Sequence, residues 1–453
     1  MVHATTISPG VNLTCVITDK FKTGCLSINL ISSLSHETAA STALLPQVLR
    51  RGSKDFPDMA RIATALDDLY GARIEPVVRK KGELHCNGFY ADFPDERYIP
   101  GGESILEKTT SLAGGMLLSP MLDENLLQAD YIEGEKKNLI DEIRAGINDK
   151  RAYSVDRLLE EMCAGEAYGV NKLGSEVEVR AITPESLTTH YYKLLAAPKI
   201  ELLYCGSAEP ERVAAALRTA LKDLPERSNI TMPETKIVLY PPDGAPRRIT
   251  ESFDVSQGKM AVGFRLGKAM NDKPDYPAMM VFNTIYGSGV TSKLFLNVRE
   301  RLSLCYYASS SIDKHKGVML VSSGVDFSNF DIALDEILAQ LEDVKTGAVS
   351  DWELLSAKRT IITSVKSAMD SPSGLLELYF DSSLSASPYD PDKLCDMIED
   401  VTVDRIVETA SEIEFDTVYF LTGEADDMSE GGDQATGVKI RGARQSEAGE
   451  DGT

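Results

Sequence analysis

The chain has 453 residues, of which 43% are hydrophobic and 26% are charged, and its formal net charge is −23. This composition is typical of a soluble globular protein with more than one domain, and its longest apolar runs are far too short to span a bilayer. The excess of acidic residues argues against a nucleic-acid-binding protein, because phosphates require a basic surface. It would suit basic or neutral peptides as ligands, or it serves only to keep the protein soluble.

The N-terminal residues and the cysteines indicate the cellular compartment. The sequence MVHATTISPGVNLTCVITDKFKTG has no basic segment followed by an apolar one, so we expect no signal peptide and a cytoplasmic location. The seven cysteines are scattered singly, without a Cys-x-x-Cys pair. We expect buried thiols rather than reactive groups.

The first half of the chain is predicted to begin with strands and to end with helices. β-Branched residues alternate in 11–18 and 24–33, which predicts two strands joined by a short turn. A helix from Glu37 to Arg51 is expected to stop at Gly52, and a second one, opened by Pro57 and Asp58, to stop at Gly71. The elements expected next are strands at 73–79 and 84–92, helices at about 102–118, 123–147, 151–165 and 185–196, a strand at 200–206 and a helix at 209–223.

The second half repeats this order after a polar, proline-rich segment, 225–248, whose composition is that of a linker. Both halves end in a helix followed by an apolar strand, at 183–206 and at 402–423. The other elements expected are strands at 249–256 and 259–266, helices at 275–286 and 291–300, strands at 304–312 and 316–325, and helices at 328–345 and 350–370.

The organisation is therefore two similar α+β halves, 1–224 and 249–423, on either side of the linker. The last segment, 424–453, is acidic and has few apolar residues, and we expect a disordered tail.

Several stretches together resemble one peptidase family. The helix that ends in RRGS, the stretches IATALDDLYGARI and EGEKKNLIDEIRAGIND, and KLFLNVRERLSLCYYASSS in the second half are similar, in this order, to the pitrilysin/insulinase family of zinc peptidases. ALLPQVLRRGS with LDDLYGA is similar to the bacterial branch described as probable inactive zinc proteases. The resemblance covers about 1–423. It implies a clamshell of two similar halves, each an antiparallel-rich sheet packed with helices, with a chamber for an unstructured peptide.

The metal motif of that family, His-x-x-Glu-His, falls on residues that cannot perform its chemistry. Counted back from Gly52, the two histidine positions fall on Ala43 and Gln47, and the general-base glutamate falls on Pro46. A methyl group has no lone pair, a proline ring cannot take a proton, and an amide is a poor zinc ligand. The histidines, at positions 3, 36, 85, 190 and 315, are too far apart in sequence for two to share a helix face. We therefore expect no metal or other cofactor in this chain, and no catalytic residue that acts in this chain alone.

Glu135 and Glu142 match a later helix of the family, where the resemblance implies a supporting carboxylate and the third zinc ligand. Their spacing corresponds to two helical turns, which places them on one face. A single carboxylate without the histidines should not retain zinc. The alternative is that both are ordinary charges of a helix rich in Glu and Lys.

The second half keeps a pair of residues that the family places near the metal from the other domain. Arg299 and Tyr306, in VRERLSLCYYASS, stand at the family's spacing. A guanidinium can hold substrate carbonyls or a carboxylate, and a phenol can donate a hydrogen bond to a tetrahedral oxyanion. Tyr307 competes for the tyrosine role, and the alternative for the pair is a surface charge and a core residue.

Two further stretches bear on peptide binding. The strand at 259–266 is either a sheet edge that an extended peptide can join or an interior strand. The glycine-rich turn GSGVTSKLF at 287–295 lacks the Walker order of Lys and Ser/Thr, so it is not a phosphate loop.

The metal motif is lost while the arginine and tyrosine are kept, and this asymmetry leads to the main hypothesis. We expect a catalytically incomplete subunit that pairs with a zinc-bearing pitrilysin-like relative and contributes Arg299 and Tyr306 to its active site in trans. Zinc is then expected in the partner subunit, and unstructured peptides are cleaved only by the complex. The alternatives are a module that binds peptides or a partner without hydrolysis, and an independent metallopeptidase with unrecognised ligands. No nucleic acid and no membrane is expected as a partner.

Overall fold

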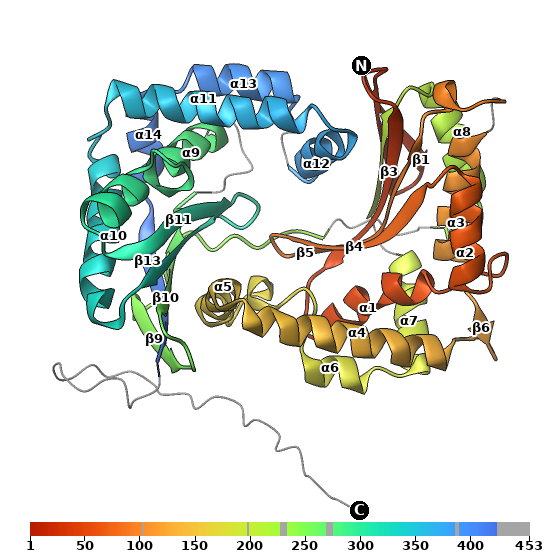
Figure 1. Cartoon of the computed structure of the whole chain (residues 1–453), viewed down its shortest axis with the longest axis horizontal. Helices are drawn as coiled ribbons and strands as arrows, with labels where there is room; N and C mark the ends of the chain where they lie inside the picture. Colours follow the sequence, from red (N-terminus) through yellow and green to blue (C-terminus); the bar gives the residue numbers. More distant parts are fainter. Residues whose placement is uncertain (102–103, 197–198, 227–232, 269–274, 386–388, 424–453) are drawn as a thin grey trace, which may run out of the picture.

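The computed structural model describes residues 1–101, 104–196, 199–226, 233–268, 275–385 and 389–423. Within these ranges the chain forms two halves that lie side by side as a clamshell, each a mixed sheet with helices packed on it (Figure 1). The predicted α+β class with two similar halves is confirmed. The tail predicted at 424–453 and residues 227–232 of the predicted linker lie outside the described residues.

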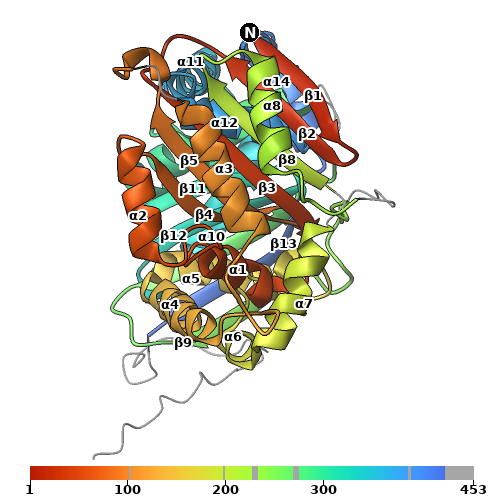
Figure 2. The same ribbon diagram turned by 90° about the vertical axis from the view of Figure 1, so that its right-hand side faces the viewer.

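The first half consists of a six-stranded sheet, a two-stranded hairpin and the helices packed around them. Its elements are β1 (Val2–Ser8), β2 (Val11–Ile17), β3 (Thr23–Ser33), α1 (Ala39–Leu49), α2 (Met59–Asp68), β4 (Arg73–Lys81), β5 (Leu84–Pro94), α3 (Ile105–Leu118), β6 (Leu122–Asp123), β7 (Leu126–Leu127), α4 (Ala129–Asn148), α5 (Lys150–Met162), α6 (Glu176–Ala181), α7 (Pro184–Leu195), β8 (Lys199–Gly206) and α8 (Pro210–Ala220). The strand order is β1-β2-β8-β3-β5-β4, antiparallel except for the parallel pair β2 and β8. Helices α1, α3, α7 and α8 cover the outer face of the sheet (Figure 2).

The second half repeats this topology. Its elements are β9 (Arg247–Ser252), β10 (Gly258–Arg265), α9 (Asp275–Asn283), η3 (Thr284–Ser288), η4 (Leu294–Arg301), β11 (Cys305–Asp313), β12 (Val318–Val325), α10 (Phe330–Lys345), α11 (Asp351–Ala368), α12 (Pro372–Ser383), α13 (Pro391–Glu399), α14 (Val403–Ala410) and β13 (Glu414–Thr422). The order β11-β12-β10-β13-β9 matches β4-β5-β3-β8-β2 of the first half. The first and last strands are parallel neighbours in both halves, β9 with β13 and β2 with β8.

Three elements differ from the sequence prediction, and for a fourth the structure decides between two alternatives. The helix predicted from 123 starts only at Ala129, because Glu124 and Asn125 adopt positive φ angles of 48° and 69° and form the turn of the hairpin β6–β7. Strand β1 and the short helix α6 were not predicted; β1 is largely exposed and lacks an apolar alternation. The strand at 259–266 is β10, an interior strand between β12 and β13, so it is not an edge for peptide pairing.

Each half contributes one helix that packs on the sheet of the other half. Along β3, Leu26, Ile28 and Leu30 face the core under the outer helices, whereas Cys25 and Ile31 face the other way. This inner face packs against Leu375, Leu376 and Phe380 of α12, which belongs to the second half. In return, Leu158 and Met162 of α5, from the first half, pack on the inner face of the second sheet. Each inner face is thus covered by a helix of the other half.

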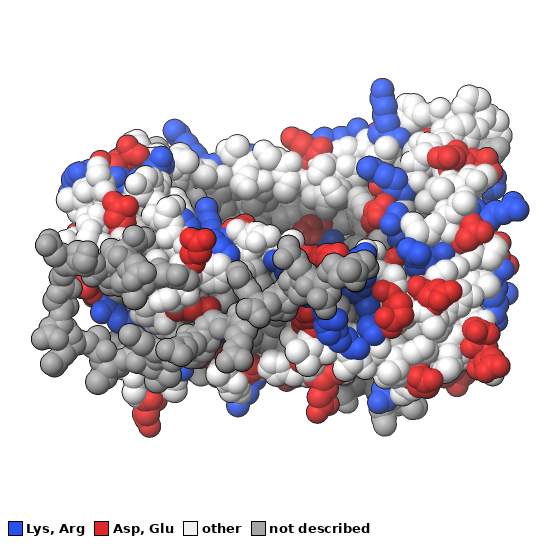
Figure 3. Space-filling view, turned by 60° about the horizontal axis from the view of Figure 1, so that its bottom comes forward, with Lys and Arg blue, Asp and Glu red and all other residues white. Residues whose placement is uncertain are grey.

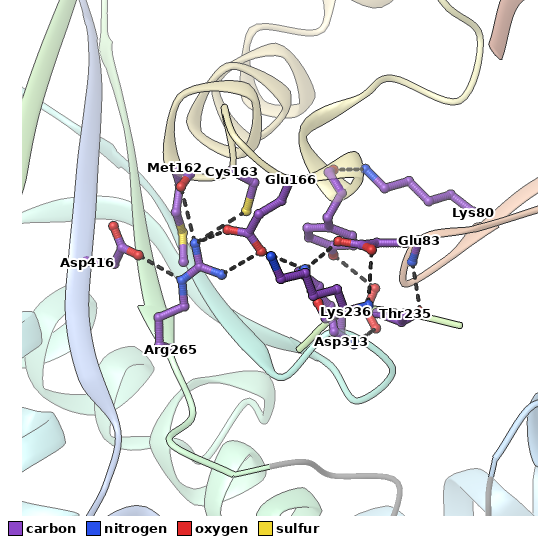
Figure 4. Close-up of polar contacts among 12 residues, drawn as sticks. Lys80, Glu83, Met162, Cys163, Glu166, Thr235, Lys236, Arg265, Asp313 and Asp416 are labelled. Atoms are coloured by element: carbon purple, nitrogen blue, oxygen red, sulfur yellow. Dashed lines mark hydrogen bonds and ion pairs between the residues drawn. The ribbon is translucent and has the colours of Figure 1, made fainter. Parts of the chain in front are cut away.

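A buried chain of alternating charges connects the halves (Figure 4). Arg265 contacts Asp416 at 2.8 Å and Glu166 at 2.6 Å, and Lys316 contacts Glu166 and Glu83, each at 2.6 Å. The side chains of Arg265 and Lys316 are 1% and 0% exposed. Glu166 and Glu83 come from the first half and the other three from the second. A buried charge without its partner is very unfavourable, and moving the halves apart would separate these charges. The ion pairs therefore favour one relative position of the halves.

Asp381 of α12 anchors a second charged contact. His315 donates to it at 2.8 Å and Lys81 of β4 at 3.2 Å, and Lys314 also contacts it. Burial alone would raise the pKa of Asp381, but the hydrogen bond from His315 and the charges of Lys314 and Lys81 outweigh burial and hold the pKa well below its usual range.

This lowered pKa predicts how acid affects the protein. The contribution of Asp381 to stability is present above the pKa of an unfolded aspartate, about 3.9, and is lost as the pH falls toward the folded pKa. We expect Asp381→Asn to lower the urea midpoint at pH 7, and to lower it less at pH 3, where the wild type has lost part of the same interaction. Urea unfolding at several pH values measures this; equal differences at both pH values would contradict it.

Three further features concern the cysteines, the length of the helices and the charges on the surface. All seven cysteines are buried free thiols, as predicted. No helix in the described ranges is long and apolar enough to cross a membrane. On the face in Figure 3, basic and acidic side chains lie interspersed between uncharged residues.

Candidate functional site

Helix α1 carries the positions that the resemblance assigns to the metal motif, and it includes a proline in its interior. Pro46 has no N–H, so the carbonyl of Thr42, four residues earlier, loses its helical hydrogen bond. Asn87 of β5 donates its Nδ2 to this carbonyl at 3.3 Å. The Thr42 hydroxyl also contacts Nε2 of His190 at 2.8 Å. These contacts from β5 and α7 keep α1 helical with proline at the position that the resemblance assigns to the general base.

The three motif positions have different surroundings. Ala43 is 2% exposed and belongs to the hydrophobic core, and Pro46 is also buried. Gln47 is half-buried and lines a pocket of about 300 Å³ between α1 and α4. The residues that line it are Gln47, Arg50, Arg51, Met59, Glu135, Asn138, Leu139 and Glu142. The structure thus brings Gln47, Glu135 and Glu142 together and leaves Ala43 and Pro46 outside the lining.

The two carboxylates of this pocket differ in environment. Glu135 is 8% exposed; its Oε1 accepts from Arg51 at 3.0 Å and its Oε2 from Asn138 at 2.9 Å. Glu142 is exposed. The predicted common face of the two glutamates is present, but among the residues that the structure describes only Glu135 has side-chain hydrogen-bond partners.

Sequence reasoning overlooked Arg51. It pairs with a residue 84 positions away, and such a contact leaves no local pattern. One signal was available: Arg51 follows Gln47 by four residues, which places it one turn further along the same face.

The pocket does not suit zinc. Zinc sites use thiolate, imidazole and carboxylate ligands, almost always four in all when water is included. Here the side chains at the two histidine positions are a methyl and an amide. In the described part of the chain, no group of three or more His, Cys, Asp or Glu side chains could hold a metal ion.

Arg299 lies on an unusual helix. η4 is π-helical, and the N–H of Leu302 donates to the carbonyl of Asn297, five residues earlier, at 3.1 Å. The Arg299 guanidinium lies 4.7 Å from the ring centre of Phe295, and its side chain is 41% exposed. Short π-helical segments are rare and occur frequently at functional sites.

Tyr306 lies on a β-bulge at the start of β11. Cys305 pairs with Val325 and Tyr307 with Gly324, so Tyr306 is the extra residue of an edge strand. Its side chain is 63% exposed. Bulges re-aim side chains and are over-represented next to active sites.

Tyr307 points elsewhere. Its ring lies 4.3 Å from the Arg151 guanidinium of α5, and its hydroxyl is buried without a hydrogen-bond partner among the described residues. Burial, the largest cause, raises the pKa of Tyr307. Of the two tyrosines, Tyr306 is therefore the one available to a ligand outside the chain.

The pocket at Gln47 and the pair Arg299 and Tyr306 lie on different halves. Within the described ranges, no hydrogen bond or ion pair joins them. The described part of the chain presents a pocket at the positions that the resemblance assigns to the metal motif, and a separate exposed arginine and tyrosine.

Comparisons with known proteins indicate the family to which the chain belongs. Residues 181–361 match the family model described as the peptidase M16 inactive domain. The chain is 33% identical to the probable inactive metalloprotease YmfF of Bacillus subtilis over 91% of this chain and 96% of that protein. A conserved protein from Enterococcus faecalis has a TM-score of 0.84 at 25% identity, covering 93% of this chain and 99% of that one.

A second solved structure, the peptidase M16 inactive domain from Pseudomonas fluorescens, has a TM-score of 0.74 at 14% identity and covers 94% of this chain and 98% of that one. At this identity the likeness shows the fold alone. The fold, the altered motif positions and the match to YmfF agree: the chain belongs to the M16 family of peptidases, the pitrilysin/insulinase family, in its branch of inactive metalloprotease-like proteins.

Proposed function

We propose that this protein is the catalytically incomplete subunit of a pitrilysin-like zinc metallopeptidase. It pairs with a zinc-bearing relative and supplies Arg299 and Tyr306 to the partner's active site. The arginine holds carbonyls of an unstructured peptide, and the phenol stabilises the tetrahedral oxyanion. The observation that carries the proposal is the contrast between a pocket without histidine ligands and an exposed arginine and tyrosine on a π-helix and a β-bulge.

Exposure supports a role in trans. Tyr306 is 63% exposed, and in the described part of the chain no hydrogen-bond partner occupies its hydroxyl. Within the described ranges, the one ion pair of Arg299 is a weak one, with its neighbour Glu300 at 3.5 Å. Both groups are therefore available to a ligand or a second chain at little cost in lost contacts.

The packing of the halves supports a second chain as well. The inner faces of both sheets are covered, by α12 and by α5, and the buried charge chain from Asp416 to Glu83 holds the halves together. An extended peptide would have to separate these contacts to enter between the halves of one chain. A chamber formed with a partner subunit avoids that cost.

Activity and metal content of the reconstituted pair test the proposal. We expect no cleavage of a mixed pool of unstructured peptides by this chain alone, and cleavage after mixing with a zinc-bearing relative encoded in the same genome. Metal analysis by mass spectrometry should find zinc only in the partner. Stoichiometric zinc together with chelator-sensitive cleavage by this chain alone would overturn the proposal.

A second candidate is a pseudoenzyme that binds peptides or a partner without hydrolysis. The ion pair between Arg51 and Glu135 favours it, because it fills the former metal pocket with a stable contact. This candidate predicts a complex whose peptidase activity does not depend on Arg299 or Tyr306.

A further inference from the structure

The strongest unexplained feature of the site is the position of Arg51. Its Nη1 lies 3.0 Å from Oε1 of Glu135, and this carboxylate side chain is 10% exposed. The guanidinium lies 5.5 Å from the ring centre of Tyr131, whose hydroxyl donates to the carbonyl of Pro57 at 2.8 Å. Arg51 is thus held by a carboxylate on one side and by an anchored aromatic ring on another.

The negative charge of Glu135 explains why Arg51 lies here. A nearly buried carboxylate requires a cation or several hydrogen bonds. Where Glu135 would support a metal ion, that ion would supply much of the positive charge. In this chain the guanidinium supplies it, and Asn138 satisfies the second oxygen at 2.9 Å.

We propose that Arg51 is a built-in counter-ion that replaces the charge of the metal in this pocket and excludes divalent cations from it. Two effects act together. A metal ion near Glu135 would have to displace a charge-assisted hydrogen bond. In addition, a fixed positive charge in the same pocket of about 300 Å³ repels a dication. Loss of the histidines is then only part of the reason why the pocket does not hold zinc.

Restoring the residues of the zinc motif should not be enough to restore tight zinc binding. Ala43→His, Pro46→Glu and Gln47→His together recreate the ligand types, with Glu142 as the third ligand. This triple variant should bind zinc only weakly, because Arg51 remains in place. Adding Arg51→Ser should increase the zinc affinity by about tenfold or more, the size of effect that residues behind metal ligands have.

Arg50 offers a matched control. It is the neighbouring arginine and also lines the pocket, but it pairs with Glu75 at 3.0 Å and not with Glu135. Zinc affinity is measured by competition with a chelating dye for the triple variant alone, with Arg51→Ser and with Arg50→Ser. Tight binding confined to the variant with Arg51→Ser supports the inference, and equal affinity of the three proteins overturns it.

A simpler variant keeps the inference testable if the triple variant does not fold. Arg51→Ser in the otherwise unchanged chain leaves the nearly buried carboxylate of Glu135 without its cation, so the melting temperature should fall. Adding Glu135→Gln should recover part of this loss. Arg50→Ser should lower the melting temperature less, and equal falls of the two arginine variants without recovery by Glu135→Gln would contradict the inference. The readout is metal affinity and stability, so it does not depend on the proposed pairing with a partner.

Discussion

Replacing Arg299 by alanine should lower the peptidase turnover of the reconstituted complex by about 10²-fold, because the guanidinium that holds the peptide carbonyls in position for attack is lost. The side chain is 41% exposed, and its one ion pair with a described residue is long, at 3.5 Å, so its removal should leave the fold intact. Assembly with the zinc-bearing relative, measured by size-exclusion chromatography, should also be unchanged. A loss in kcat that exceeds any change in KM would identify an interaction made in the transition state.

Arg301 is the matched control for this experiment. It lies on the same π-helical segment, its side chain is 62% exposed, and it contacts Glu336 at 3.5 Å. Arg301→Ala should retain near-normal turnover if the effect belongs to Arg299 and not to the charge of η4. Unchanged turnover of Arg299→Ala in an assembled, zinc-loaded complex would rule out its catalytic role and favour the binding pseudoenzyme.

Most of the fold could be predicted because its elements have local signals. Residues of β2 and β3 alternate between two faces, and Asp58 caps α2, with its side chain accepting from the N–H of Arg61 at 2.8 Å. The repeat in sequence order corresponds to a repeat in strand order. Strand β10 was ambiguous for a physical reason: it is buried on both sides, and a run of apolar residues does not reveal which strands flank it.

The site could be predicted only in part, because its decisive contacts are distant in sequence. The motif spacing located Gln47, Glu135 and Glu142 in one pocket, but not the ion pair that joins Arg51 to Glu135 across 84 residues. The same holds between the halves: Lys316 has the composition of a surface residue, and its burial follows from partners 150 and 233 residues away. The roles of Arg299 and Tyr306 remain predictions, although their π-helix and β-bulge could not be foreseen from spacing.

The largest expected effect on stability is that of Lys316→Met. This side chain is 0% exposed and contacts Glu166 and Glu83, each at 2.6 Å. Removing the ammonium leaves Glu83 buried without its cation, and breaking a buried pair in this way costs about 3–5 kcal/mol. Glu166 loses less, because Arg265 still contacts it at 2.6 Å. Urea unfolding at pH 7 should show a clearly lower midpoint than the wild type.

Lys345→Met is the control, because it removes a lysine from an ion pair whose carboxylate is exposed to solvent. Lys345 contacts Glu342 at 3.0 Å within α10, and the glutamate side chain is 63% exposed. Such a pair contributes about 0–1 kcal/mol, so the midpoint should hardly move. Adding Glu83→Gln to Lys316→Met removes the uncompensated charge and should recover part of the loss, whereas the same change alone should destabilise. If Lys316→Met unfolds at the wild-type midpoint, the buried charges do not fix the relative position of the halves, and the presentation of Arg299 to a partner must depend on the apolar contacts of α5 and α12 instead.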